Sequence, residues 1–281
     1  MDLLLLDHLS LSTHSKLLLD DTSFHLAEGD LVLLTGKNGV GKSTLVKALL
    51  NDPQLEGENI ALSCVASFAG KNVGKNFDNL HKQISYVSQN DSFAFDTVLD
   101  CLVSSIIDFV APDTLEKAAF AFVKENHLFS VLFPNDEKVK IRPFQYVTKR
   151  LLKRFSFDRS APTQEEIKTA IFLERKVNRL SGGQKKMVNN ICGLIKYPFA
   201  KLCIFDEPIN NLDFANVRIF SNLLTMLNRK YPKTAAIVIS HCRCLPAINK
   251  AYYIENQKIN LETSKILCNS CFGTISDGLY L

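Results

Sequence analysis

The sequence predicts an α/β fold built on a mainly parallel sheet, and three observations support this prediction. Short apolar runs with strand character alternate with segments of helical periodicity. A glycine-rich loop stands between an apolar run at 31–35 and a helix opening at 45–50. Two further apolar runs, at 202–206 and 235–239, are followed directly by polar or charged residues. Because ligands of parallel sheets bind at the carboxyl ends of the strands, we expect one common site at these ends.

The composition is that of an ordinary globular protein. The chain has 281 residues, 46% of them hydrophobic and 22% charged, so it can bury a sizeable core as one large domain or two small ones. The net charge of +4 is too small to argue for nucleic acid as a partner. Residues 1–7 are too short and too acidic for a signal peptide, and no apolar run approaches the length of a membrane span. We therefore expect a cytosolic protein that meets a membrane only peripherally or through a partner.

The eight cysteines are expected to be mostly reduced in that compartment. Four of them lie in apolar surroundings and are predicted to be small core residues, namely Cys64, Cys101, Cys192 and Cys203. The others form two short pairs, Cys242 with Cys244 and Cys268 with Cys271. These pairs fit either a zinc site of four thiolates or unpaired thiols, and the unusual spacing of the first pair favours the thiols.

The first elements expected are the strands of a small antiparallel sheet that leads into the glycine-rich loop. Apolar runs at 3–11, 17–19, 23–26 and 31–34 alternate with turn residues. The loop that follows has the pattern G-x-x-x-x-G-K-S and comprises Gly36, Lys37, Asn38, Gly39, Val40, Gly41, Lys42, Ser43 and Thr44. Between a strand and a helix this pattern predicts a phosphate-binding loop, since the glycines let backbone N–H groups face an anion. Lys42 would reach the β- and γ-phosphates, and the Ser43 hydroxyl would bind Mg²⁺.

A helical region is expected after the strand that ends at Gln89. Apolar residues recur at helical spacing over 97–133, with Pro112 between two helices. Basic and aromatic residues then crowd the segment 138–159. This segment is interpreted either as the solvated face of an amphipathic region or as a contact surface for lipid headgroups, nucleic acid or an acidic partner, and its modest charge excess favours the first. Thr163, with a glutamate three residues later, predicts the start of another helix.

The second half of the chain supplies candidate catalytic residues. The apolar run 202–206 ends in Asp206 and is followed by Glu207, and His241 stands just after the run 235–239. Together with a phosphate loop, these side chains are what hydrolysis of a phosphoanhydride needs. We predict that Asp206 positions Mg²⁺ and that Glu207 polarises the attacking water as general base. His241 would hold this water and the γ-phosphate by hydrogen bonds.

The order of these motifs resembles the ATP-binding cassette (ABC) family over nearly the whole chain. The most specific element is similar to the signature sequence of that family and comprises Ser181, Gly182, Gly183 and Gln184. Gln89 matches the glutamine that couples the helical subdomain to Mg²⁺, and Asp213 lies in a segment that matches the loop between two cassettes of a dimer. His241 matches the switch histidine.

The resemblance implies a P-loop ATPase core with a mainly parallel sheet, an N-terminal antiparallel β-subdomain and an enlarged α-helical subdomain. We expect residues 1–89 to form the β-subdomain and the first part of the core. Residues 90–178 would form the helical subdomain, and residues 179–281 the second part of the core. The implied cofactors are ATP and Mg²⁺.

The resemblance also implies that two cassettes close head to tail over two ATP molecules, each signature facing the γ-phosphate bound by the other chain. With one phosphate loop and one signature, this chain needs a second copy or a related partner. It departs from the family pattern in three places. Thr13 and His14 stand where an aromatic residue usually stacks on adenine, Cys242 replaces a commoner acidic residue, and the segment between Gln89 and Leu180 is longer than usual.

Our main hypothesis is a Mg-dependent ATPase subunit of an ABC transporter, held at the inner face of the cell membrane by a separate membrane-embedded permease. The alternative is a soluble cassette ATPase acting on a cytosolic assembly, a ribosome or nucleic acid. The segment 210–213 is similar to the translation-factor branch, but those proteins resemble two cassettes in one chain. A nucleotide-binding scaffold with little turnover is disfavoured by the presence of Glu207 and His241.

Overall fold

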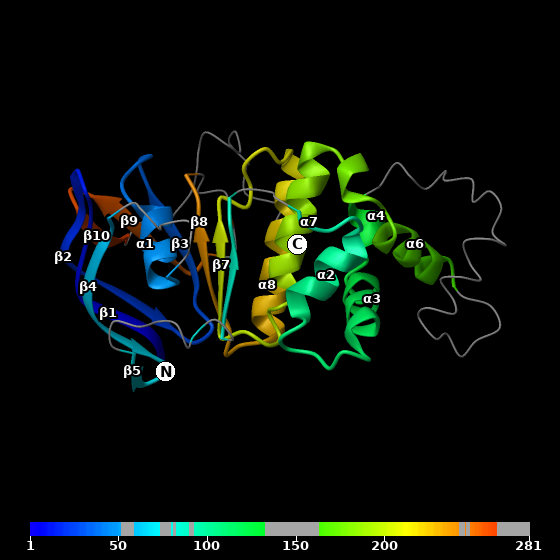
Figure 1. Ribbon diagram of the computed structural model, residues 1–281, viewed down its shortest axis with the longest axis horizontal. Coiled ribbons are helices and arrows are strands. Elements are labelled where there is room, and N and C mark those ends of the chain that lie inside the picture. The colour runs from blue at the N-terminus through cyan, green and yellow to red at the C-terminus, as the bar shows by residue number, and fades with distance from the viewer. Residues whose placement is uncertain are drawn as a thin grey trace, which may run out of the picture. The chain divides into compact units, whose positions relative to one another are not determined.

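The computed structural model describes residues 1–51, 59–73, 80, 83–89, 93–132, 163–241, 245 and 248–262. The chain forms two compact units, each drawn from separate stretches of sequence (Figure 1). The sheet unit comprises Met1–Gln89, Tyr197–Asn210 and Leu224–Leu281, and the helical unit comprises Asn90–Lys196 and Asn211–Leu223. The basic aromatic segment 138–159 and the four cysteines Cys242, Cys244, Cys268 and Cys271 lie outside the described residues.

The first sheet of the sheet unit is antiparallel, in the order β2-β1-β4-β5. Its strands are β1 (Asp2–Thr13), β2 (Lys16–Ala27), β4 (Ala61–Phe68) and β5 (Lys71–Asn72). The structure corrects one expectation, because the runs 17–19 and 23–26 belong to a single strand, β2. Asp21 has a left-handed φ of 39° at a place where the pairing shifts register, so the apolar alternation is interrupted although the strand continues.

The second sheet has six strands in the order β10-β9-β3-β8-β7-β6. They are β3 (Leu31–Gly36), β6 (Ile84–Val87), β7 (Leu202–Asp206), β8 (Ala235–Ile239), β9 (Lys250–Glu255) and β10 (Lys258–Glu262). All neighbours pair in parallel except β9 and β10, which form a hairpin. This arrangement confirms the mainly parallel sheet that the sequence predicts.

Strand β3 lies in this second sheet, whereas the sequence analysis grouped the run 31–34 with the antiparallel one. The reason is burial, since every residue of β3 is buried and a strand without a polar face needs cover on both sides. Strands β7 and β8 are buried along their whole length in the same way. Helix α1 (Lys42–Leu49) follows β3, so the glycine-rich loop lies at the carboxyl end of a central strand.

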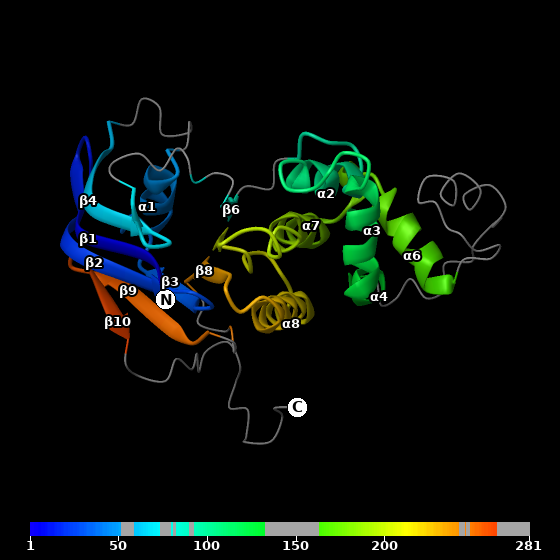
Figure 2. The same cartoon turned by 90° about the horizontal axis from the view of Figure 1, so that it is seen from below.

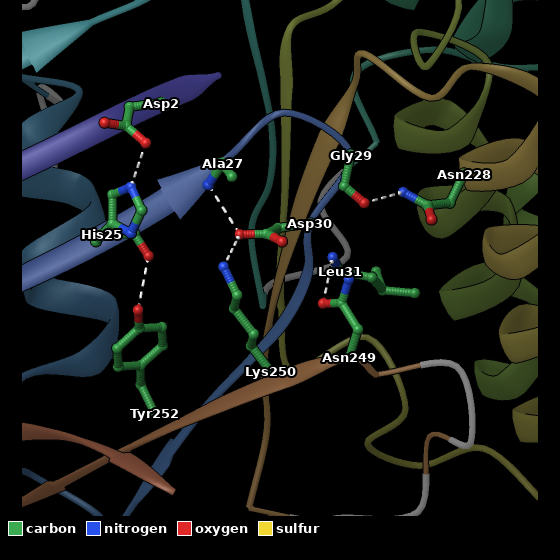
Figure 3. A network of polar contacts seen from close by, with 10 residues as sticks. All are labelled: Asp2, His25, Ala27, Gly29, Asp30, Leu31, Asn228, Asn249, Lys250 and Tyr252. Atoms are coloured by element: carbon green, nitrogen blue, oxygen red, sulfur yellow. Dashed lines mark hydrogen bonds and ion pairs between the residues drawn. The ribbon is translucent and has the colours of Figure 1, made fainter. Parts of the chain in front are cut away.

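The turn that leads into β3 is held by polar contacts (Figure 3). Asp30 accepts a hydrogen bond from the backbone N–H of Ala27 at 2.8 Å and an ion pair from Lys250 at 2.6 Å. The backbone N–H of Leu31 donates to Asn249 Oδ1 at 3.0 Å. Because Lys250 and Asn249 stand at the start of β9, these contacts place β3 beside β9.

The helical unit contains α2 (Val98–Ile106), α3 (Leu115–Glu125), α4 (Leu128–Leu132), α6 (Gln164–Leu173), the 3-10 turn η4 (Val177–Arg179) and α7 (Gly182–Leu194). Helix α3 packs against α2 and α6, and Figures 1 and 2 both show α3 beside α6. Thr163 caps α6 and Glu166 completes the reciprocal pair of bonds, which confirms the predicted helix start. In the described part of the chain, no helix combines the length and apolar character needed to cross a bilayer.

Helix α7 packs against α2 and groups with the helical unit, whereas the predicted division placed all of residues 179–281 in the core. Helix α8 (Phe214–Lys230) is divided, its residues from Leu224 onward grouping with the sheet unit. The functional division into three segments stays a prediction, because packing alone assigns no function.

The four cysteines in the described ranges are free thiols. Cys101 and Cys203 are buried as predicted, while Cys64 and Cys192 are only partly buried. Burial raises the pKa of Cys101 to about 12, so this thiol stays protonated at neutral pH.

Candidate active site

The glycine-rich loop has the backbone geometry that its sequence predicts. Gly39 and Gly41 have φ values of 75° and 102°, which side chains rarely tolerate. At Gly41 an added Cβ would lie 3.1 Å from two carbons of the Leu18 side chain, so the start of β2 closely approaches the loop. Gly41 is also the N-cap of α1, and no side chain in the described residues caps this helix. Its free N–H groups and positive dipole end are therefore available to an anion.

Lys42 lies inside this loop rather than in solvent. Its Nζ donates to the carbonyl oxygens of Gly36 at 2.9 Å and Lys37 at 3.0 Å. Burial lowers the pKa of Lys42, and the nearby charges of Glu207 and Asp206 partly oppose this effect. The ammonium is thus held in place by two backbone carbonyls of the loop itself.

Asp206 and Ser43 meet at the carboxyl end of β7. The Ser43 hydroxyl donates to Asp206 Oδ1 at 2.9 Å, although the two residues are 163 positions apart. The Tyr86 hydroxyl donates to the other oxygen, Oδ2, at 3.1 Å. A hydroxyl and a carboxylate are hard oxygen donors of the kind Mg²⁺ prefers, so this pair fits a magnesium ion. Ser43 would bind the ion directly, and Asp206 would hold it directly or through its water shell.

Glu207 is held in a strained and buried position. Its φ is 49°, its backbone N–H donates to the Ile239 carbonyl at 2.9 Å, and only 4% of the residue is exposed. Its Oε1 lies 3.1 Å from His241 Nε2, and within the described residues its buried Oε2 has no hydrogen-bond partner. Burial raises the pKa of Glu207, while the charges of His241 and Lys42 lower it. One oxygen is therefore held by His241, and the other is left to accept a proton.

The sheet unit thus contains the loop 36–44, Asp206, Glu207 and His241. Ser43 of the loop is bonded to Asp206, and Glu207 is paired with His241. Gln89 also lies in this unit, exposed just after the end of β6. Its roles toward Mg²⁺ and nucleotide stay predictions.

The helical unit contains the remaining predicted residues. Ser181 is the N-cap of α7, and its hydroxyl accepts from the Gln184 N–H at 3.3 Å while Gln184 Oε1 accepts from the Ser181 N–H at 3.0 Å. A Cβ added at Gly182 would meet nothing within 4 Å among the described residues, and one at Gly183 would make only an ordinary contact. Asp213 accepts from the Asn216 N–H at 2.8 Å at the start of α8.

Two residues near the site were missed by the sequence analysis. One is Tyr86, which was recognised only as part of a strand, because the direction of a strand side chain depends on which strand lies beside it. The other is Lys16, whose Nζ donates to the Gly39 carbonyl at 3.3 Å. A lysine at the start of a strand is common, and the residues around Lys16 do not predict a contact with the loop.

Comparisons with known proteins agree with the arrangement of these motifs. Residues 19–210 match the family model described as ABC transporter. The chain is 28% identical over 220 residues to the zinc uptake system ATP-binding protein ZurA of Listeria monocytogenes, covering 78% of this chain and 69% of that protein. It is 25% identical over 236 residues to the manganese transport system ATP-binding protein MntB of Bacillus subtilis, covering 83% and 75%. Its fold is similar to that of cbiO1 from Clostridium perfringens, with a TM-score of 0.63, 19% identity and coverage of 93% and 88%.

Proposed function

The chain belongs to the ABC transporter family, and from this premise we propose that it binds ATP with Mg²⁺ and hydrolyses it in a head-to-tail dimer of cassettes. In this proposal hydrolysis drives transport through a separate membrane subunit, and the chain lies in the cytoplasm, peripherally at the inner face of the membrane. The observation that carries the hydrolytic part is the meeting of the loop residue Ser43 with Asp206 at 2.9 Å, beside Glu207. The relatives act in transport systems and support this function over a soluble, non-transport ATPase.

In the proposed mechanism, each step is carried out by a residue of the sheet unit. The N-terminus of α1 and the Lys42 ammonium would bind the phosphates, and Ser43 and Asp206 would hold the metal ion. When bound, Mg²⁺ supplies positive charge that neutralises the phosphate oxygens. Water forms the new bond to the γ-phosphorus, the bond to the bridging oxygen of ADP breaks, and the water proton passes to Glu207 Oε2. His241 keeps Oε1 in place during this transfer.

The helical unit would complete the site of the second cassette. Ser181 keeps its own O–H as a donor, because in the cap its oxygen accepts and does not donate. This proton and the N–H groups at the start of α7 would face the γ-phosphate bound by the partner chain. Asp213 would contribute to the contact between the two cassettes. The partner is a second copy or a related subunit.

Substitution of Glu207 by Gln tests the catalytic proposal. Phosphate release should fall by about 10²- to 10⁴-fold, because the amide cannot accept the water proton. The variant should still dimerise in the presence of ATP, as measured by size-exclusion chromatography. Glu255→Gln, at an exposed position of the same unit, serves as control and should turn over normally. Unchanged turnover in Glu207→Gln would remove this residue from the general-base role.

The transport proposal is tested separately, by purifying the tagged chain from detergent extracts of its native host. A membrane-embedded protein should co-purify in defined proportion, and an untagged chain gives the background. Recovery of the chain without any membrane protein would refute the transporter function while leaving the ATPase chemistry untouched.

A further inference from the structure

Tyr86 lies on β6, whose neighbour in the sheet is β7. In the parallel register Tyr86 stands opposite Ile204, and Asp206 follows two residues later on β7. Because side chains on a strand alternate between the two faces, Ile204 and Asp206 share a face of the sheet. The long Tyr86 side chain reaches diagonally along this face, which brings its hydroxyl to 3.1 Å from Asp206 Oδ2.

The two oxygens of Asp206 therefore have different partners. Oδ1 accepts from the Ser43 hydroxyl of the phosphate loop, and Oδ2 accepts from Tyr86. Asp206 is only 1% exposed, so solvent has little access to replace a lost donor. The orientation of the carboxylate about its own axis is thus set from both sides.

We propose that Tyr86 is a positioning residue for the magnesium site, acting through its hydroxyl on Asp206 Oδ2. With Oδ2 held, Oδ1 is directed toward Ser43, where the two oxygen donors converge. The inference rests on the proposed function, because it takes Asp206 as a group that holds Mg²⁺. Nucleotide contacts made by the loop backbone and Lys42 do not involve Tyr86, so they should not depend on it.

The test uses the full chain with Tyr86→Phe, which removes only the hydroxyl. Affinity for a fluorescent, non-hydrolysable ATP analogue is measured in EDTA and over a titration with Mg²⁺, and Mn²⁺ binding is followed by electron paramagnetic resonance. The Mg²⁺ concentration for half-maximal effect should rise about tenfold, as for other groups that orient metal ligands. Affinity in EDTA should equal that of the wild type.

Tyr252→Phe is the matched control. Tyr252 is a buried tyrosine of the same unit, and its hydroxyl donates to the His25 carbonyl at 2.7 Å (Figure 3). This control also loses one hydrogen bond donated by a tyrosine hydroxyl, but its acceptor is a backbone carbonyl of β2 and not Asp206. It should keep the wild-type response to Mg²⁺ and Mn²⁺.

The outcomes separate the inference from the function on which it rests. A wild-type chain whose nucleotide affinity ignores Mg²⁺ would refute the proposed magnesium site. A responsive wild type with Tyr86→Phe equal to Tyr252→Phe would overturn the role of Tyr86 alone. Weaker binding in EDTA would also overturn it, since general damage to the fold would then explain the effect.

Discussion

Two helices of this chain begin at segments predicted to face a nucleotide, and they begin differently. The N-cap of helix α1 is Gly41, in a left-handed conformation, and in the described residues no side chain caps this helix. The N-cap of helix α7 is Ser181, whose hydroxyl accepts from the Gln184 N–H while the Gln184 side chain accepts from the Ser181 N–H. The first N-terminus has no side-chain cap. At the second, the cap takes up the N–H groups of Ser181 and Gln184 and does not involve those of Gly182 and Gly183.

The difference lies in how far apart the stabilising partners are in sequence. The reciprocal cap of α7 spans three residues, so it forms wherever that short sequence is helical. The loop before α1 depends on Leu18 packed against Gly41 and on Ser43 bonded to Asp206, 163 residues away. We infer that the phosphate loop adopts its binding conformation only when the sheet unit is folded, whereas the cap of α7 is formed largely by local contacts.

Of the substitutions that test this comparison, the removal of Lys42 should have the largest effect. Lys42→Ala deletes a buried ammonium held by Gly36 and Lys37, and should weaken ATP binding by roughly 10- to 100-fold, the loss expected for a charged hydrogen bond. Fluorescence titration measures the affinity. Lys47→Ala, on the same helix, should bind ATP nearly as the wild type does. Equal losses in the two variants would mean that general positive charge, and not placement in the loop, attracts the nucleotide.

Replacing a glycine by alanine at each helix N-terminus should destabilise the protein at α1 and not at α7. Gly41→Ala meets the Leu18 side chain at 3.1 Å and needs a φ of 102°, so it should lower the free energy of unfolding by about 1–3 kcal/mol. Gly182→Ala has open space and an ordinary φ, so it should stabilise the fold by no more than about 1 kcal/mol. Urea unfolding measures both. A destabilised Gly182→Ala would contradict the view that this helix start is unconstrained.

Removing the cap of α7 should separate its local role from its proposed functional one. Ser181→Ala and Thr163→Ala each delete the capping hydroxyl of a reciprocal pair in the helical unit, and each should cost about 1 kcal/mol of stability. Only Ser181→Ala should also lower ATP hydrolysis by the dimer, because Thr163 caps a helix with no predicted nucleotide contact. Parallel losses of hydrolysis in both variants would reduce Ser181 to a capping residue.

The smallest effect expected is a difference in pH dependence between two buried carboxylates, one in each unit. Burial raises the pKa of Glu207 above its ordinary 4.5, whereas the hydrogen bond from Lys124 lowers the pKa of Glu166. The folded chain therefore holds the Glu207 proton more tightly than the unfolded chain, and stability from this group falls as the pH rises above about 4.5. Stability from Glu166 is present above about 4.5 and is lost as the pH falls through its lowered pKa.

Urea unfolding of the two glutamine variants at several pH values checks this sign. Relative to the wild type, Glu207→Gln should gain stability as the pH rises from 4 to 7, and Glu166→Gln should lose it. The neutral amides remove the titration without removing the shape of the side chain. Parallel pH slopes for both variants would show that the two environments do not differ as their burial and partners predict.

The local features of this protein could be predicted from its sequence. The phosphate loop, the caps at Thr163 and Ser181, and the strand that ends in Asp206 all depend on residues within a few positions of one another. The mainly parallel sheet was also predictable, because runs such as 202–206 and 235–239 are apolar on both faces. For the same reason Asp206 and His241 could be expected at one edge of the sheet.

Only the tertiary structure decided which distant residues meet. It joined two apolar runs into β2, moved β3 to the second sheet and grouped α7 with the helical unit. It also brought the Tyr86 hydroxyl to Asp206 and Lys16 to the phosphate loop. These contacts depend on strand order and register, which are set by the packing of the whole chain, whereas a cap or a glycine turn depends on the backbone within one turn of itself.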